Sequence, residues 1–445
     1  MATRGATGDG IQGAYVADPN GLRGRDRVTH LNGFGRSLGY PVAFPEPGAH
    51  PKPVPDDIPL ALPDIGPAEE AEVLEVLRSG RLAMGPKALE FERLLAGFTG
   101  APWAAAASSG TAGLHLAFRA LGVGADDCVL TTSFTFVASA NAITYQGAEP
   151  VLLDIEPGTL TLSLDALRIY LDSCKEGDDG DLLDPVTHRR VAAVEPVDVF
   201  GHPVHLERLR EVTAPWGIPV VADACEALGS RWRRDDGTWA HAGAGADAAV
   251  FAFYPNKQIA TGEGGMVTGS DPDLDERIRS LRNQGRRPGD PWLHHTRIGF
   301  NYRMSELQAA VGVAQMRRVG DLLHRRAALA DRYADALADV EELRPPRAAD
   351  WADPAWFVMA LRCAPGVDRD RLVEHLNRSG VESKAYFEPP VHRQPPYAGR
   401  DDLVPAPLTA TEEAAASVLI VPFYAAMPLG DVDRVVSSLK AGLAR

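Results

Sequence analysis

The chain is poor in cysteine and has no long hydrophobic run. Its 445 residues include four cysteines, which follow neither a metal-ligand spacing nor a dense disulfide pattern: Cys128, Cys174, Cys225 and Cys363. No apolar segment is long enough to span a bilayer, and the N-terminus lacks the apolar core of a signal peptide. We therefore expect a cytoplasmic protein with reduced thiols, without a metal centre and without a membrane partner.

Positive charge is also scarce. Asp and Glu number 60 against 45 for Lys and Arg, which gives a formal net charge of -15 at pH 7. A protein that neutralises nucleic-acid phosphates needs a basic surface, so this balance argues against nucleic acids and anionic membranes as partners. An anionic small molecule would have to be held by local arginines, lysines or helix amides.

Composition divides the chain into three parts. Residues 1–58 are rich in Gly, Pro and Arg and show no sustained period, which predicts an extended or partly disordered N-terminal extension. A length of 445 residues is ample for two domains. We expect a large domain over residues 59–320 and a small C-terminal α+β domain over residues 321–445.

Short apolar runs alternate with helical ones across the large domain. Runs this apolar predict strands buried on both faces of a mostly parallel sheet sandwiched by helices, an α/β architecture. Such sheets bind ligands beyond the carboxyl ends of their strands. After the sheet, Ser305 and Gln308 form a capping-box pattern that predicts one long helix to about Val340. The apolar runs are CVLTTSF, PVLLDI, VAAVEPVDVF, PVVADAC, AAVFAFY and GMVTGS.

A single lysine, Lys257, stands between an apolar run and the glycine-rich residues 261–265. A lysine there is costly to bury as an ammonium ion and shifts readily toward its neutral, nucleophilic form. That is the form with which an enzyme binds an aldehyde cofactor as a Schiff base. The alternative is a solvated amine on a surface loop, and the motif alone does not decide between the two.

Three further positions suit a planar, phosphorylated ligand. Asp223 closes the apolar run PVVADA, where a buried carboxylate needs a cation such as a protonated pyridine nitrogen; its alternative role is a helix cap. Phe136 could lie on the face of a planar ring, or it could be a core side chain. Residues 108–111, SSGT, open a helix, so their amides and the helix dipole suit a phosphate, although the same residues also make an ordinary N-cap.

Five motifs follow one another in a fixed order: SSGTAGLHLAF, TTSFTFVASANAI, VVADACEALGS, FAFYPNKQIATGEGG and GFNYRMSELQAAVGVAQM. On these motifs, nearly all of the chain after the N-terminal extension resembles the DegT/DnrJ/EryC1/StrS aminotransferases. The resemblance implies the pyridoxal 5'-phosphate-dependent transferase fold type I and the amination of a keto sugar, mostly nucleotide-linked. It makes Lys257 the residue that binds the cofactor aldehyde and Asp223 the partner of the ring nitrogen. Phe136 would lie on the ring face, with Gly110 and Thr111 at the phosphate.

The resemblance also assigns residues around that centre. Glu226 would lie near the ring oxygen, where many members have glutamine or histidine. The family's usual phosphate-binding serine is Ala252 here, so that contact is either lost or supplied by a neighbour, Asn256 or Tyr254. Asn301 would reach across a homodimer interface to the phosphate in the neighbouring active site. The candidate substrate contacts are Tyr386, His392 and Arg303.

The implied reaction has two halves that share one lysine. Lys257 would carry a proton between substrate carbon and cofactor carbon, glutamate or glutamine would supply the amine, and pyridoxamine 5'-phosphate would form in between. Two alternatives stay open: amination of a cyclitol or another small ketone of natural-product biosynthesis, and a non-catalytic regulator that kept the fold. The sugar dehydratase branch of the family has histidine in place of the lysine, so Lys257 argues against that branch.

Overall fold

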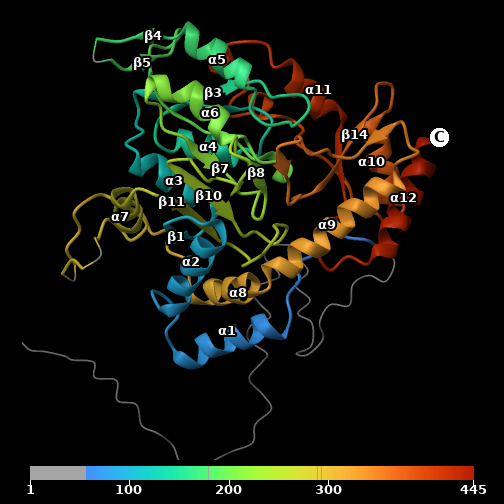
Figure 1. Ribbon diagram of the computed structural model, residues 1–445, viewed down its shortest axis with the longest axis horizontal. Helices are drawn as coiled ribbons and strands as arrows, with labels where there is room; N and C mark the ends of the chain where they lie inside the picture. The colour runs from blue at the N-terminus through green and yellow to red at the C-terminus, as the bar shows by residue number, and fades with distance from the viewer. Residues whose placement is uncertain (1–56, 179, 288, 292, 445) are drawn as a thin grey trace, which may run out of the picture. The chain divides into compact units, whose positions relative to one another are not determined.

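The computed structural model describes residues 57–178, 180–287, 289–291 and 293–444 (Figure 1). The predicted N-terminal extension, residues 1–58, lies outside this range apart from its last two residues. Ile58 is buried, and its backbone forms a parallel bridge with Val381. Asp56–Arg445 forms one compact unit, and the division into two domains near residue 320 stays a prediction.

A sheet at the centre of this unit runs in the order β1-β11-β10-β7 and continues through β6 to β2 and β3. Bridges from Val194 to Val220 and from Val197 to Asp223 join β7 to the end of β6. Every neighbouring pair is parallel except the two that involve β11. The strands are β1 (Trp103–Ala107), β2 (Asp127–Thr132), β3 (Glu149–Leu153), β6 (Arg190–Val194), β7 (Val221–Asp223), β10 (Ala248–Ala252) and β11 (Gly265–Gly269).

Helices cover both faces of this sheet (Figure 1). One face carries α2, α5, α6 and α8, and the other carries α3, α4 and α7, whereas α1 packs on α8. The helices are α1 (Pro67–Ser79), α2 (Pro86–Thr99), α3 (Gly110–Ala120), α4 (Ala138–Thr144), α5 (Leu164–Ser173), α6 (Leu206–Thr213), α7 (Pro272–Leu281), α8 (Glu306–Arg317) and α9 (Val319–Ala336). None of the described helices is long and apolar enough to cross a membrane.

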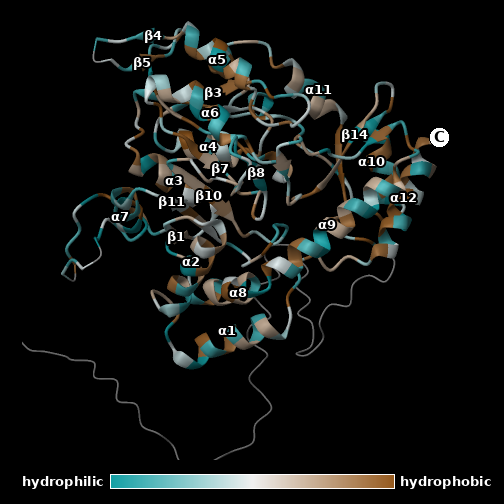
Figure 2. Cartoon of the chain, in the orientation of Figure 1, coloured by the Kyte–Doolittle hydropathy of each residue, from teal (hydrophilic) through white to brown (hydrophobic). Residues whose placement is uncertain are grey.

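The central strands are apolar on both sides because each side faces helices. Along β10, Ala249 and Phe251 pack with α2 and α8, whereas Ala248 and Val250 pack with α3. This alternation has the two-residue period of an extended chain. Figure 2 shows brown and teal mixed along the helices that enclose these strands. The mostly parallel sheet between helices that the sequence predicts is thereby confirmed.

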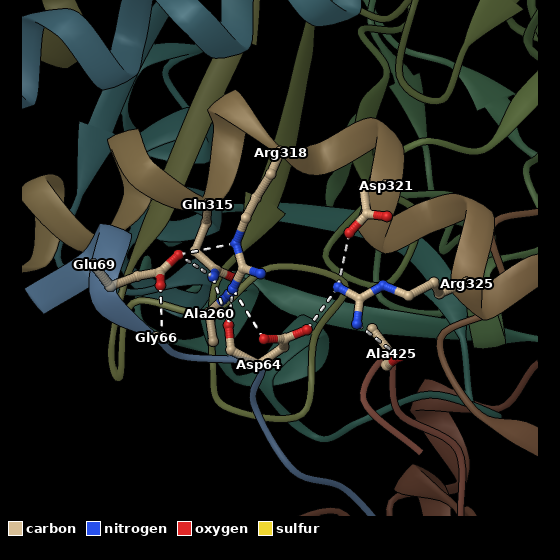
Figure 3. A network of polar contacts seen from close by, with 9 residues as sticks. All are labelled: Asp64, Gly66, Glu69, Ala260, Gln315, Arg318, Asp321, Arg325 and Ala425. Carbon is tan, nitrogen blue, oxygen red and sulfur yellow. Dashed lines mark hydrogen bonds and ion pairs between the residues drawn. The ribbon is translucent and has the colours of Figure 1, made fainter. Parts of the chain in front are cut away.

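The prediction of one long helix from Ser305 to about Val340 is wrong. The capping box at Ser305 is present, but α8 and α9 are separate helices that meet at Arg318, whose φ of -121° interrupts the helical backbone. At this break the Arg318 guanidinium donates to the carboxylates of Asp64 and Glu69, both at 3.1 Å (Figure 3). Contacts with the segment around α1 therefore accompany the change of helix direction.

The polar cluster in Figure 3 also reaches the loop that carries Lys257. Gln315 accepts a hydrogen bond from the N–H of Ala260, which lies three residues after that lysine, at 3.4 Å. Arg325 pairs with Asp64 at 2.6 Å and donates to the Ala425 carbonyl at 3.3 Å. Segments from the beginning, middle and end of the described chain are therefore joined beneath the Lys257 loop.

The C-terminal part forms a second, antiparallel sheet in the order β12-β14-β16-β15, with α10 and α12 packed against it. This is the α+β arrangement that the sequence predicts for this region. Its elements are β12 (Leu343–Arg344), β14 (Met359–Cys363), α10 (Arg369–Arg378), β15 (Lys384–Ala385), α11 (Thr409–Ser417), β16 (Val418–Val421) and α12 (Leu429–Leu443). Smaller strands are β4 (Lys175–Glu176), β5 (Leu182–Leu183), β8 (Arg231–Arg233), β9 (Trp239–His241) and β13 (Ala352–Asp353).

Candidate active site

A cavity of about 520 Å³ lies where β1, β2, β7 and β10 end. These strands are parallel to one another, so their carboxyl ends meet at one edge of the sheet, which is where ligands bind in α/β proteins. Most of the predicted site residues line this cavity: Gly110, Thr111, Phe136, Asp223, Glu226, Asn256, Lys257 and Tyr386.

Lys257 lies in a tight turn after β10, with its N–H donating to the Tyr254 carbonyl at 2.9 Å. Its side chain is only 12% exposed. The amine lies 3.3 Å from a carboxylate oxygen of Glu226 and 3.8 Å from the centre of the Phe357 ring. A solvated surface lysine would have neither contact, so this alternative does not fit the geometry.

Asp223 ends β7 and is 6% exposed. Its Oδ2 accepts a hydrogen bond from the Ser139 hydroxyl at 2.8 Å, and its Oδ1 accepts one from the Cys225 N–H at 3.1 Å. Within the described part of the chain, Asp223 has no ion pair. A buried carboxylate without a cation is unfavourable, so the cavity fits a ligand that brings a positively charged atom to Asp223, such as a protonated pyridine ring.

A pyridoxal phosphate also needs a place for its negatively charged phosphate, and the start of α3 provides one. Ser109 is the N-cap and accepts from the Ala112 N–H at 3.1 Å. The first amides of a helix have no intrahelical partner and carry partial positive charge, which suits an anion. A Cβ on Gly110 would lie 2.8 Å from the Ala252 Cβ, so glycine lets this turn approach β10 closely. Pyridoxal phosphate therefore fits the donors and acceptors of the cavity at both ends.

Phe136 could contact the face of a planar ring bound in this cavity. Phe136 is 59% exposed and lines the cavity, which excludes the alternative role of a core side chain. Asn256, the proposed substitute for the missing serine, lines the cavity as well, and its Oδ1 is buried without a hydrogen-bond partner in the described structure. Both residues are therefore placed to contact a bound ligand.

Three predicted residues lie outside the cavity. Asn301 is exposed and forms a backbone bridge with Asn283. Arg303 donates to the Asn283 side chain at 2.9 Å and lines a separate cavity of about 540 Å³. His392 lies between the Ser133 hydroxyl and the Glu412 carboxylate, each at 2.7 Å. Within one chain, these residues do not join the group around Lys257.

Residues 63–440 match the sequence model of the DegT/DnrJ/EryC1/StrS aminotransferase family. The chain belongs to this family. This is a family of pyridoxal-phosphate-dependent aminotransferases, so the predicted enzyme class and the predicted fold type I are both confirmed.

Relatives of this aminotransferase extend over most of its length. GDP-perosamine synthase of Caulobacter vibrioides is 34% identical over 386 residues, 86% of this chain and 97% of that protein. The erythromycin biosynthesis sensory transduction protein EryC1 of Saccharopolyspora erythraea is 36% identical over 368 residues, 82% of this chain and 93% of that protein. The solved structure of DesI in the presence of its TDP-sugar product has 31% identity and a TM-score of 0.76, covering 88% of this chain and 94% of that one.

Sequence reasoning missed the residues that hold Asp223 in this aminotransferase. Ser139 donates to Asp223 and is itself 3.0 Å from the Thr135 hydroxyl. Both hydroxyls belong to the motif SFTFVASANAI, on either side of Phe136. The signal available in the sequence was the position of Ser139, which lies three residues after Phe136 at the start of a helix.

Further acidic groups surround Asp223. Glu195 and Asp198 are almost wholly buried, and burial, reinforced by the charge of Asp223, raises the pKa of both carboxyls well above the ordinary range. Burial also raises the pKa of Glu226, although the charge of Lys257 opposes that effect. The aminotransferase therefore holds several carboxyls that favour the neutral form beneath one cavity.

The raised pKa of Glu195 predicts a pH-dependent stability. Above the ordinary glutamate value of 4.5, folding must keep this carboxyl protonated. The free energy of unfolding of the wild type should therefore fall, relative to Glu195→Gln, by about 1.4 kcal/mol per pH unit until the folded carboxyl ionises. Urea unfolding at pH 5, 6, 7 and 8 measures this difference.

Glu413→Gln, the same change on an exposed helix position, serves as the matched control for that measurement. A difference between wild type and Glu195→Gln that stays constant from pH 5 to pH 8 would contradict the assignment.

Proposed function

We propose that this aminotransferase converts a keto sugar, carried on a nucleotide diphosphate, into an amino sugar, with glutamate or glutamine as the amino donor. The observation that carries the proposal is the presence of Lys257 and Asp223 in the wall of one cavity. The relatives support the substrate class, since one is a GDP-perosamine synthase and another was solved with its TDP-sugar product.

The cavity residues divide the work of holding the cofactor, pyridoxal 5'-phosphate, and its amino form, pyridoxamine 5'-phosphate. Lys257 would bind the aldehyde carbon, Asp223 would accept a hydrogen bond from the ring nitrogen and keep it protonated, and Phe136 would cover one ring face. The amides of Gly110 and Thr111 would bind the phosphate. When bound, the cofactor supplies an electron sink for the carbon atom that loses a proton.

The chain itself supplies proton transfer and orientation. The amine of Lys257, once free, can take a proton from one carbon and return it to another, because it lies inside the cavity rather than in solvent. Ser139 donates to one oxygen of Asp223 at 2.8 Å, and this bond would keep the carboxylate oriented for a bound cofactor ring. Tyr386 lines the same cavity and is the substrate-facing candidate within one chain.

One relative is named a sensory transduction protein, a name that would suit the alternative of a non-catalytic regulator. A regulator has no need for a buried carboxylate that lacks its own cation, nor for a buried lysine in the wall of the same cavity. The geometry at Asp223 and Lys257 therefore favours catalysis.

We further propose a homodimer with active sites at the interface. Asn301 and Arg303 lie away from the cavity of their own chain, and Asn301 is exposed. Exposed apolar side chains gather nearby, with Met84 and Leu89 lining the same separate cavity as Arg303. A second copy of the chain would cover these side chains and receive Asn301 at its phosphate end.

The substrate class is tested by loading the protein with pyridoxamine 5'-phosphate and adding candidate ketones. Nucleotide-linked keto sugars should restore the absorbance of the aldehyde form at least about tenfold faster than the same sugars without the nucleotide, because the carrier adds binding energy. Stopped-flow spectroscopy measures the rates. A response confined to keto cyclitols would contradict the sugar assignment, and failure to bind the cofactor at all would favour the regulator.

The role of Asn301 is tested by mixing two inactive variants. Lys257→Ala lacks the lysine, and Asn301→Asp places a negative charge where the partner's phosphate would lie. If Asn301 serves the neighbouring site, a refolded equal mixture should recover about a quarter of wild-type activity, because mixed dimers contain one intact site.

Each variant refolded alone controls for the refolding step in that experiment. A mixture no more active than its two components would show that Asn301 serves its own chain or neither.

A further inference from the structure

The amine of Lys257 occupies a defined place in the wall of the cavity. One side of it is the Glu226 carboxylate at 3.3 Å, and the other is the face of the Phe357 ring at 3.8 Å. Carboxylates and aromatic faces both attract ammonium ions. The two side chains, named here the ammonium site, enclose an amine that would otherwise point freely into the cavity.

Both walls of the ammonium site are fixed by the backbone of one residue, Phe200. The Phe200 N–H donates to the second carboxylate oxygen of Glu226 at 2.8 Å, and the Phe200 carbonyl accepts from the Phe357 N–H at 2.8 Å. Phe200 has a φ of 58°, which is unfavourable for a residue with a side chain. The chain therefore holds an unfavourable backbone conformation at the residue that sets the distance between the carboxylate and the ring.

Gly201, the residue after Phe200, also packs closely against the backbone of both walls of the ammonium site. Gly201 has a φ of 89°, and a Cβ there would lie 3.0 Å from the Phe357 nitrogen and 3.1 Å from the Glu226 carbonyl oxygen. Glycine is the residue that tolerates both the conformation and the contact.

A second set of contacts supports each wall from behind. Gln258 donates to the backbone carbonyl of Glu226 at 2.5 Å. Arg326, wholly buried, donates to the carbonyls of Trp356 and Phe357 at 3.0 and 2.6 Å. Burying a guanidinium with backbone oxygens as its partners is costly, and these bonds hold the segment just before β14, which carries the Phe357 ring.

We infer that the ammonium site holds the amine of Lys257 whenever the lysine is not bonded to the cofactor, and that Glu226 exchanges one proton with it. In that exchange a proton leaves Nζ for Oε1, which gives a neutral amine and a neutral carboxylic acid, and it returns by the same path. Glu226 is then a positioning residue that acts through Lys257. The inference rests on the proposed function, in which Lys257 must alternate between proton acceptor and proton donor.

The electrostatics of the cavity favour such an exchange. Burial raises the pKa of Glu226, against the opposing charge of Lys257, so this carboxylate accepts a proton more readily than an exposed one. Glu226 also lies 8% exposed and close to the amine, which excludes most competing water from the contact.

The experiment measures the reactivity of Lys257 in the full-length, cofactor-free chain. A short pulse of isotopically labelled acetic anhydride at pH 8 acetylates neutral amines, and peptide mass spectrometry gives the ratio of label on Lys257 to label on exposed Lys175. Glu226→Gln should raise this ratio about tenfold, because loss of a nearby opposite charge favours the neutral amine. Glu226→Asp should keep the ratio nearer to that of the wild type.

Matched variants separate the ammonium site from general charge effects. Glu263→Gln removes a carboxylate from the wall of the same cavity at an exposed position and should leave the ratio unchanged. Phe357→Leu removes the ring face and should raise the ratio about threefold, which keeps the inference testable if Glu226→Gln does not fold.

Equal ratios in the wild type, Glu226→Gln and Phe357→Leu would overturn the inference. The labelling uses neither cofactor nor sugar, so this outcome is distinct from failure of the proposed sugar aminotransferase activity.

Discussion

A carboxylate buried without a cation of its own is the constraint around which this aminotransferase is built. Asp223 ends a central strand, accepts hydrogen bonds from Ser139 and Cys225, and faces a cavity instead of an arginine or lysine partner. Such a group is tolerated when a ligand completes the pair, and otherwise it lowers stability by several kcal/mol. Glu195 and Asp198 are also buried, and burial together with the charge of Asp223 raises the pKa of both carboxyls. The folded chain therefore suits a ligand that brings a positive charge to this carboxylate.

Lys257, the lysine that would bind the cofactor, is also fixed by several contacts. Its loop is tied through Ala260 to the polar cluster of Arg318 and Arg325 at the junction of α8 and α9 (Figure 3). Its amine lies between Glu226 and Phe357, and one unfavourable residue, Phe200, fixes both. Backbone strain that persists in a folded protein is often found at functional sites. Here it lies directly behind the reactive amine.

The sequence was sufficient to predict most strands of the central sheet and the residues that follow them. Lys257, Asp223 and Phe136 each follow an apolar run, so the parallel sheet alone brings them to one edge. It was not sufficient where a conformation depends on distant partners. Arg318 stands in a helix-favouring stretch, and its contacts with Asp64 and Glu69 come from about 250 residues earlier. The bond from Ser139 to Asp223 spans 84 residues, and the alanine-rich strand β1 has weak strand propensity. Asn301 and Arg303 stay outside the cavity of one chain, which the linear order of motifs does not reveal.

The most direct test of the central claim, that Lys257 and Asp223 hold one ring, is borohydride reduction of the protein with pyridoxal 5'-phosphate, followed by peptide mapping. In the wild type we expect the pyridoxyl adduct on the peptide that contains Lys257, close to one per chain. Asp223→Ala should lower cofactor affinity by about tenfold or more, because the ring nitrogen loses its charged partner. An adduct spread over exposed lysines such as Lys175 and Lys384, or an affinity indifferent to residue 223, would contradict the account.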